Sequence, residues 1–462
     1  MSTWQEFYSQ IRDPTWPNCH KESDFESLPQ SIKRECIDVF GYQPGQFQKS
    51  SKLQNRRFPI STATACQLKW NWSTIFLTTE QTASCHRTDH HRFDTEKFDF
   101  HNTPNKQDDR QRMLQGSWPQ NGCDYCKDIE SAGGQSDRLT NLDFPGIHAP
   151  PELDHNPQAV WVTPRILEVY FDNTCNLKCL YCGPHFSSLW DAENVRFGLK
   201  PFAKSSNIEQ NKQKIFAWLR EHGHSLTVFN ILGGEPLYQS ELDQCIDLFD
   251  QHPAPELKLQ IFTNLNCKLS HLQKTVEKIK HLIDQNKLRE FEITASLDCW
   301  GEPQQYVRYP LDLENWEKNF EYLLTQPWIN LIISSTVTPL TVKTLPDLLE
   351  KINQWNQTRP VWHYQNSVNS PDYMFIDMFG DIFSKDFERA LELKPNNTPE
   401  QQASREYLAG IAQQSASRQP DVGKITTLFD FLHQMDLRRG TDWSRTFPWL
   451  VHEFAKYALT RN

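Results

Sequence analysis

Short apolar runs alternate with longer stretches of helical spacing between residues 165 and 366. The apolar runs predict strands over 165–171, 226–232, 257–264, 290–297, 329–338 and 361–366. The stretches between them predict helices near 207–222, 238–252, 270–286, 313–326 and 342–357. Strands that are separated by single helices pair in parallel through right-handed crossovers. The pattern therefore predicts an α/β fold, a partial (β/α)6 barrel with its active site at the C-terminal ends of the strands.

The regions on either side of this pattern differ from it and from each other. Residues 1–150 show little periodicity, so metal ligation or packing on a neighbour would have to hold them. A proline-rich stretch over 144–164 looks like a linker. Helices are predicted near 386–394, 398–416, 424–439 and 445–459. We therefore expect an irregular N-terminal domain (1–150), a barrel (151–366) and a mostly helical C-terminal region (367–462) that caps the barrel or its substrate channel.

Composition narrows the class of protein. The chain has 462 residues and is 37% hydrophobic, which suits a globular protein with large cores. No apolar run has the length of a membrane span, and the N-terminus lacks the layout of a signal peptide, so we expect a cytoplasmic protein. The net charge of −10 argues against binding nucleic acid by bulk charge. It does not exclude binding through a local basic groove.

The most informative of the 12 cysteines are Cys175, Cys179 and Cys182, which follow the first predicted strand. Clustered cysteines in a long chain without an export signal point to metal ligation rather than disulfides. Three thiolates can hold a four-iron cluster and leave one iron open to a ligand. A zinc site with a fourth ligand such as His185 is the alternative. The scattered cysteines are expected to be buried free thiols: Cys19, Cys36, Cys245, Cys267 and Cys299.

With Tyr181 before the last cysteine, this spacing resembles the signature of the radical S-adenosylmethionine superfamily. The resemblance implies that the three cysteines bind a [4Fe-4S] cluster whose open iron is chelated by the amino and carboxylate groups of S-adenosylmethionine. It also implies reductive cleavage of that cofactor to a 5′-deoxyadenosyl radical, which abstracts a hydrogen from the substrate. In such enzymes the cofactor carries the chemistry, and the protein supplies position and a dry cavity.

The run Gly233-Gly234-Glu235 ends the second predicted strand and resembles the GGEP motif of the superfamily. The resemblance implies that its backbone and Glu235 meet the amino group of the methionyl part. Two glycines let a backbone approach a ligand closely. A plain strand-to-helix turn is the alternative.

Further polar residues stand at the ends of later strands. The resemblance implies that Asn264, Ser296 and Asp298 hydrogen-bond the ribose and methionyl groups, whereas turn or cap roles are the alternative. It implies that Arg308 pairs with the cofactor carboxylate, and a surface salt bridge is the alternative. It also places Val337 beside the adenine, against a plain core position.

A second set of cysteines, Cys66, Cys85, Cys123 and Cys126, precedes the barrel. Four cysteines saturate either a zinc ion or a [4Fe-4S] cluster, and their chemistry alone does not separate the two. Other residues resemble the SPASM/twitch branch of the superfamily: Glu130, Gly133, Gly134, Ser136 and Arg138, Gly183-Pro184-His185, and Arg439-Gly-Thr-Asp-Trp443. The resemblance favours one auxiliary [4Fe-4S] cluster in an iron–sulfur region over 1–150, although better-known members carry such clusters after the barrel.

Neighbouring residues leave two questions open. A histidine among His86, His90 and His91 could replace a cysteine as ligand, or all three could be solvated. Trp70 and Trp72 shield a cluster or belong to the core, and the core is the safer prediction.

Members of the SPASM/twitch branch commonly modify peptides. The leading hypothesis is a maturase that crosslinks, epimerises or excises part of a ribosomally made precursor peptide. Such an enzyme would need an electron donor such as flavodoxin or ferredoxin, and a small partner that binds the leader peptide is a further possibility. The alternatives are a dehydrogenase of a small alcohol or sugar and a non-enzymatic iron–sulfur electron carrier or scaffold. No residue is singled out as a catalytic acid or base.

Overall fold

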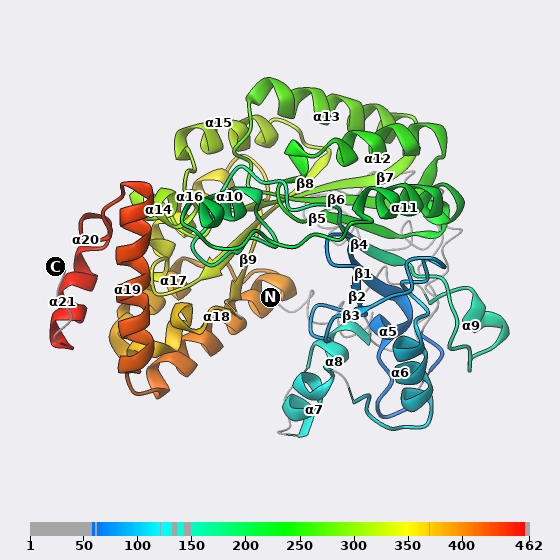
Figure 1. The fold of residues 1–462 in the computed structure, drawn as a ribbon, viewed down its shortest axis with the longest axis horizontal. Coiled ribbons are helices and arrows are strands. Elements are labelled where there is room, and N and C mark those ends of the chain that lie inside the picture. Colours follow the sequence, from blue (N-terminus) through cyan, green and yellow to red (C-terminus); the bar gives the residue numbers. More distant parts are fainter. Residues whose placement is uncertain are drawn as a thin grey trace, which may run out of the picture.

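A single nine-stranded sheet organises the molecule, in the order β3-β2-β1-β4-β5-β6-β7-β8-β9 (Figure 1). The structure is a computed structural model and describes residues 58–457 except 61, 121, 132–135, 143–148 and 369. Six strands are those predicted from the apolar runs: β4 (Ile166–Tyr170), β5 (Val228–Leu232), β6 (Ala254–Thr263), β7 (Leu288–Ser296), β8 (Ile329–Val337) and β9 (Trp362–Ser367). Every neighbouring pair among them is parallel, so their carboxyl ends share one edge of the sheet.

The predicted crossover helices are also present: α11 (Ile208–His222), α12 (Ser240–Gln251), α13 (Leu269–Asp284), α15 (Leu313–Leu324) and α16 (Leu345–Trp355). Figure 1 shows α11, α12, α13 and α15 along one face of the sheet. Their apolar stripes explain this placement; α13, for example, buries Leu272, Val276 and Ile279 against the main core. Two shorter helices, α10 (Ser188–Arg196) and α14 (Glu302–Val307), lie near the carboxyl ends of the strands.

Three strands precede the six that the sequence predicts. β1 (Trp72–Phe76) pairs in parallel with β4, and β2 (Gln81–Ala83) and β3 (His91–Arg92) follow it in antiparallel order. The N-terminal region therefore extends the central sheet, although its sequence shows little periodicity. Its helices are α5 (Gln67–Asn71), α6 (Pro104–Leu114), α7 (Asp124–Ser131), α8 (Asp137–Leu142) and α9 (Glu152–His155).

The buried apolar residues form two clusters. The larger one combines the central sheet, its helices and the C-terminal helices. The smaller one lies in the N-terminal region and contains Trp70, Cys66 and Cys123, together with Leu153 and Val162 from the stretch predicted to be a linker. Trp70 is fully buried and belongs to the same cluster as Cys66 and Cys123.

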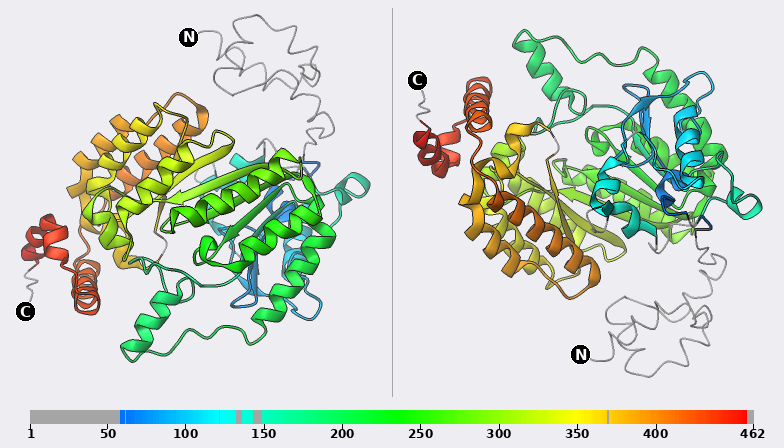
Figure 2. Two further views of the ribbon diagram at one scale, coloured as in Figure 1. Left: turned by 90° about the horizontal axis from the view of Figure 1, so that it is seen from above. Right: turned by 90° about the horizontal axis from the view of Figure 1, so that it is seen from below.

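The C-terminal region is helical, as predicted. It contains α17 (Ser384–Leu393), α18 (Pro399–Ser417), α19 (Val422–Arg439), α20 (Trp443–Thr446) and α21 (Pro448–Lys456). The capping box of Thr398 and Gln401 begins α18, and the side chain of Asp421 caps α19. These helices lie at the β9 end of the sheet, whereas the N-terminal region lies at the other end (Figure 2). Within the described ranges, no helix combines the length and the apolar character needed to cross a bilayer.

Candidate functional site

The cysteines of the first motif lie in the loop between β4 and α10, at the carboxyl edge of the sheet. Backbone contacts hold this loop: Lys178 N–H donates to Tyr309 O at 2.7 Å, and Leu180 N–H donates to Val307 O at 2.8 Å. The indole N–H of Trp190 donates to Cys179 O at 2.7 Å. Cys179 is buried, whereas Cys175 and Cys182 are partly exposed. The loop is thus a fixed segment that turns three thiols toward the strand ends.

Burial raises the pKa of each of these thiols. The pKa of Cys182 rises to about 12, through desolvation first and then through the nearby Cys179. Cys175 and Cys179 shift in the same direction for the same leading reason, and the Cys175 thiol also senses both other cysteines. Ligands to iron must be thiolates, so loading this site releases protons that the apoprotein holds. For Cys175 and Cys182 the neighbouring thiols add to this upward shift of the pKa.

The glycine turn after β5 packs directly against the cysteine loop. Gly233 and Gly234 have φ of +84° and +56°. A Cβ on Gly234 would lie 2.1 Å from Thr174 O, which no side chain can tolerate. The N–H of Glu235 donates to the same carbonyl at 2.8 Å. Only glycine therefore allows the end of β5 to approach the residue before Cys175 so closely.

Glu235 is fully enclosed, and its carboxylate is used within the chain. One oxygen accepts from Thr263 Oγ1 at 2.7 Å and from the N–H of Leu237 at 3.1 Å, and the other accepts from the N–H of Asn264 at 2.6 Å. Burial raises the pKa of Glu235 to about 7, against the lowering effect of these donors. The side chain joins the end of β5 to the end of β6. It thereby fixes Asn264, whose Nδ2 lies 3.9 Å from Cys175 Sγ.

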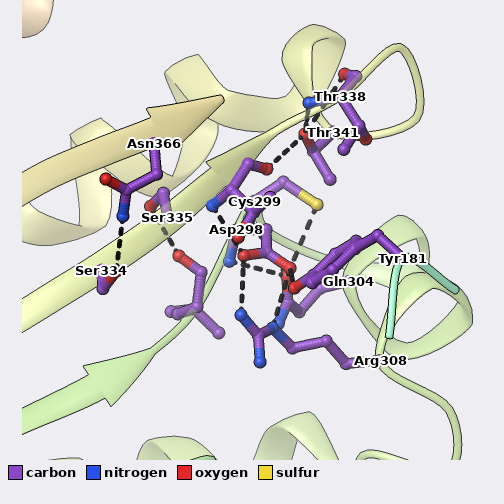
Figure 3. Close-up of polar contacts among 12 residues, drawn as sticks. Tyr181, Asp298, Cys299, Gln304, Arg308, Ser334, Ser335, Thr338, Thr341 and Asn366 are labelled. Atoms are coloured by element: carbon purple, nitrogen blue, oxygen red, sulfur yellow. Dashed lines mark hydrogen bonds and ion pairs between the residues drawn. The ribbon is translucent and has the colours of Figure 1, made fainter. Parts of the chain in front are cut away.

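Arg308 forms an ion pair with Asp298 (Figure 3). Its Nε and Nη2 donate to the two oxygens of Asp298 at 2.8 and 2.9 Å. The partner is a wholly buried carboxylate, so the ion pair is interior and not the surface bridge considered from the sequence. The sequence could not show this pairing, because α14 folds Arg308 back onto the end of β7.

Asp298 also connects the strand ends to the cysteine loop. Its Oδ2 accepts from the hydroxyl of Tyr181 at 2.6 Å (Figure 3). Its Oδ1 accepts from the N–H of Thr336 at 2.8 Å. The Arg308 guanidinium carbon lies 5.6 Å from the centre of the Tyr181 ring. Gln304 Oε1 accepts the N–H groups of Asp298 and Cys299. Tyr181, Asp298 and Arg308 therefore act together as an interior support for the loop.

The remaining predicted residues occupy strand ends. Ser296 ends β7 opposite Ser334 of β8, and it is partly exposed. Val337 ends β8 and is 1% exposed, within the main core. Asn264 donates to Asn176 Oδ1 at 2.8 Å, which ties the end of β6 to the residue after Cys175. All the residues predicted from the first motif and the strand ends thus gather along the carboxyl edge.

A cavity of about 850 Å³ opens beside this edge. The cysteine loop contributes Tyr181, Cys182 and His185, and β8 contributes Thr336. The opposite wall comes from α19 and from Val368, Ser370, Pro371 and Tyr373. The third cysteine therefore faces a space with room for a ligand, between the sheet and the C-terminal helices.

The second set of cysteines also converges. Cys66, Cys85, Cys123 and Cys126 line one small enclosed cavity in the N-terminal region, although 57 positions separate Cys66 from Cys123. Burial raises the pKa of Cys66 to about 12 and that of Cys123 to about 11. In the part of the chain that the structure describes, no group of three or more His, Cys, Asp or Glu side chains is arranged around a single ion position. Four cysteines that line one cavity are a donor set that suits either a zinc ion or a [4Fe-4S] cluster.

Charged residues surround this cavity. Lys69 lines it, is 2% exposed and donates to Asp109 at 2.5 Å. Burial lowers the pKa of Lys69, but Cys123, Asp109 and then Cys85 raise it, and the net shift is upward. A buried cation beside thiols favours their thiolate form.

The other residues named with this set are distributed as follows. Arg138 pairs with Glu130 and donates to Ala65 O at 2.7 Å, and Ser136 Oγ donates to Glu130 at 2.5 Å. His86 lines the cavity, His91 contacts Thr103 Oγ1 at 2.8 Å, and the ring of His90 lies 4.4 Å from that of Phe76. Trp72 packs against the smaller core. Gly133, Gly134, Cys19 and Cys36 lie outside the described residues; Cys245, Cys267 and Cys299 are buried free thiols, as predicted.

The C-terminal motif that begins at Arg439 docks on the cysteine loop. Arg439 pairs with Glu193 of α10 at 3.0 Å, and Glu193 also pairs with Lys178 inside the motif loop. Its guanidinium carbon lies 4.6 Å from the ring centre of Trp190, the residue that holds Cys179 O. Glu193 and Lys178 carry no motif of their own, because their role depends on a contact with Arg439 about 250 positions later.

A search of solved structures finds distant likenesses. A structure of anSMEcpe with bound AdoMet and the Cp18Cys peptide aligns at 17% identity with a TM-score of 0.32, over 49% of this chain and 57% of that chain. Streptococcus suis SuiB bound to the precursor peptide SuiA aligns at 13% identity with a TM-score of 0.35, over 70% of this chain and 69% of that one. The chain thus spans little more than half the length of anSMEcpe. No protein-family model and no curated protein matches the chain. At these TM-scores the likeness supports no conclusion about function. Any conclusion about function therefore rests on the residues of the site.

Proposed function

We propose that this chain is a radical S-adenosylmethionine enzyme of the SPASM/twitch branch and that its substrate is a peptide. The observation that carries the proposal is the contact between the two motifs. The Gly234 turn can approach Thr174 only because it lacks a side chain, and this contact brings the end of β5 against the loop of Cys175, Cys179 and Cys182. A carrier of electrons has no need of such a cradle beside its cluster.

When bound, the cluster and S-adenosylmethionine supply a carbon radical that takes a hydrogen from the substrate. The chain's own residues would hold the cluster and enclose the cofactor and the substrate. The three cysteines provide thiolates, and Glu235 fixes the ends of β5 and β6 around the loop. The buried pair of Asp298 and Arg308 holds the loop through the hydrogen bond from Tyr181 to Asp298. The cavity beside Cys182 is the proposed place of the substrate.

The peptide substrate and the auxiliary cluster belong to the same proposal. The cavity has walls from the loop, from the stretch around Tyr373 and from α19, so a side chain with its flanking backbone has room there. Cys66, Cys85, Cys123 and Cys126 are proposed to hold one auxiliary [4Fe-4S] cluster, which offers an acceptor for the electron left after a net oxidation.

Iron and sulfide counts after anaerobic reconstitution test the two clusters. Wild type should hold about eight irons, and the Cys175/Cys179/Cys182→Ala variant should hold about four. The matched control is Cys245→Ala, a buried free thiol on α12 that should leave the iron count unchanged. An unchanged iron count in the triple variant contradicts the assignment of the first motif.

Turnover separates the remaining alternatives. Reduced enzyme should cleave S-adenosylmethionine to 5′-deoxyadenosine and change the mass of a precursor peptide encoded nearby. Absence of cleavage in fully loaded enzyme favours an electron carrier or scaffold. Cleavage that oxidises a small alcohol or sugar and leaves every tested peptide unchanged favours a dehydrogenase instead.

A further inference from the structure

One side of α19 faces the cavity beside the cysteine loop. Its lining residues are Thr427, Asp430, Phe431, Gln434, Met435 and Arg438. Their spacing of three and four positions places them along a single stripe of the helix. The helix lies across from Cys182, so this stripe forms the wall that a bound substrate would touch first on the side away from the cluster.

Arg438 at the end of this stripe is a fixed cation without an anion. Its Nη1 donates to Asn194 Oδ1 at 3.1 Å, and its guanidinium carbon lies 4.9 Å from the ring centre of Phe197. Its Nε is buried and finds no acceptor among the described residues. Nor does any Asp or Glu of the described ranges form an ion pair with it. The next residue, Arg439, differs in that it pairs with Glu193.

A guanidinium held in this way is prepared for an anion. Its planar fork matches a carboxylate, and no carboxylate of the described residues already pairs with it. Phe197 and Asn194 fix the orientation of the group, so little side-chain freedom is lost on binding. The cavity carries its opposite charge at a distance: Asp430 is eight positions earlier, roughly 12 Å along the helix.

Two aromatic side chains line the same cavity. The rings of Tyr373 and Phe431 lie 5.0 Å apart, and both line the cavity. We propose that Arg438 binds a carboxylate of the substrate while an apolar side chain next to that carboxylate lies against Tyr373 and Phe431. The inference rests on the proposed function, because it takes this cavity as the substrate cavity, and it assigns an acidic peptide to it.

The carboxylate has two sources that share one chemistry, an acidic side chain or a free carboxyl terminus. Three peptides distinguish them: Ac-Ala-Phe-Asp-Phe-Ala-NH2, its Asn counterpart, and Ac-Ala-Phe-Ala-Phe-Ala with a free carboxyl end. Binding to the reconstituted holoenzyme with S-adenosylmethionine is measured by calorimetry without reductant, so that no turnover is needed. We expect at least one acidic peptide to bind about tenfold more tightly than the neutral one, since hydrogen bonds to charged groups have this magnitude.

Variants of Arg438 decide the role of this residue. Arg438→Gln should abolish the preference for the acidic peptide, and Arg438→Lys should retain part of it. The control is Arg445→Met on α20, which is exposed and lies outside the cavity, and which should keep the full preference. Melting temperatures show whether Arg438→Gln folds. If it does not, the acid preference of Arg438→Lys is compared with that of the wild type.

Two results overturn the inference. One is equal affinity of the wild type for acidic and neutral peptides, and the other is a full preference retained in Arg438→Gln. The failure of the proposed function has a separate sign, because it appears as a loaded wild type that cleaves no S-adenosylmethionine. An enzyme that cleaves the cofactor but shows no acid preference refutes the role of Arg438 alone.

Discussion

The contact between Gly234 and Thr174 allows a quantitative test of how the site is built. In Gly234→Ala, the new Cβ would lie 2.1 Å from Thr174 O and 2.7 Å from its carbonyl carbon. Both of these atoms belong to the backbone, so the overlap of about 1 Å can be relieved only if the turn or the loop moves. That movement loses the hydrogen bond from Glu235 to Thr174, about 1 kcal/mol, and adds overpacking of about 1–3 kcal/mol.

Strain from the positive φ must be subtracted, and the chain offers a control for it. Gly116 has a φ of +72°, and a Cβ added there meets nothing within 4 Å. Gly116→Ala therefore experiences the backbone strain alone, about 1–2 kcal/mol, partly offset by a stiffer unfolded chain. Gly234→Ala should lower the free energy of unfolding by about 2–4 kcal/mol more than Gly116→Ala does.

Urea unfolding of the two apoprotein variants measures this difference, and iron counts after reconstitution measure its consequence. If the turn positions the cysteine loop, Gly234→Ala loses iron from the first motif, whereas Gly116→Ala keeps the iron count of the wild type. Equal stabilities of the two variants, with full iron in both, would refute the reasoning that close approach explains the glycine.

Three further outcomes are expected. Asp298→Asn leaves Arg308 buried without its carboxylate and should cost about 3–5 kcal/mol in urea unfolding, whereas Glu290→Gln, which breaks a surface pair, should cost less than about 1 kcal/mol. Burial lowers the pKa of Lys394 from 10.5 to about 7, so between these pH values the unfolded chain binds a proton that the folded chain does not. The free energy of unfolding should therefore rise from about pH 7 to pH 9 by up to about 1.4 kcal/mol per pH unit. Lys394→Met should lose that slope. Lys69→Met removes a buried cation beside the second set of cysteines and should make the midpoint potential of the auxiliary cluster more negative in an EPR-monitored titration, and an unchanged potential would contradict its influence.

The strand and helix pattern of the central region was predictable because each element carries its own periodicity. The ranges 257–264 and 313–326, for example, correspond closely to β6 and α15. Local apolar spacing decides such elements, since their faces must bury against neighbours of the same region. The positions of Cys175 and Gly234 at strand ends followed from the same pattern, and the parallel pairing of β4 and β5 then brings them to one edge.

The N-terminal strands were not predictable in this way. β1 is only five residues long, and two of its residues are polar and buried, so its sequence has no clear alternation. Thr74, for instance, donates to Glu168 of β4 at 2.7 Å inside the fold. A strand whose polar side chains are satisfied by a partner 94 positions later reveals itself only when that partner is in place. The pairing of Arg308 with Asp298 was also not predictable, because it depends on how α14 folds back onto the end of β7.

The C-terminal helices determine more of the site than their distance along the chain suggests. Arg439 fastens α19 to α10 through Glu193, and Glu193 in turn holds Lys178 between two cysteines of the first motif. One face of the same helix forms a wall of the cavity beside Cys182. A shift of α19 would therefore change the cavity and the support of the cysteine loop together. Glu193 therefore links the helix that lines the cavity to the cysteine loop, and the effect of substrate on the cluster should depend on this carboxylate.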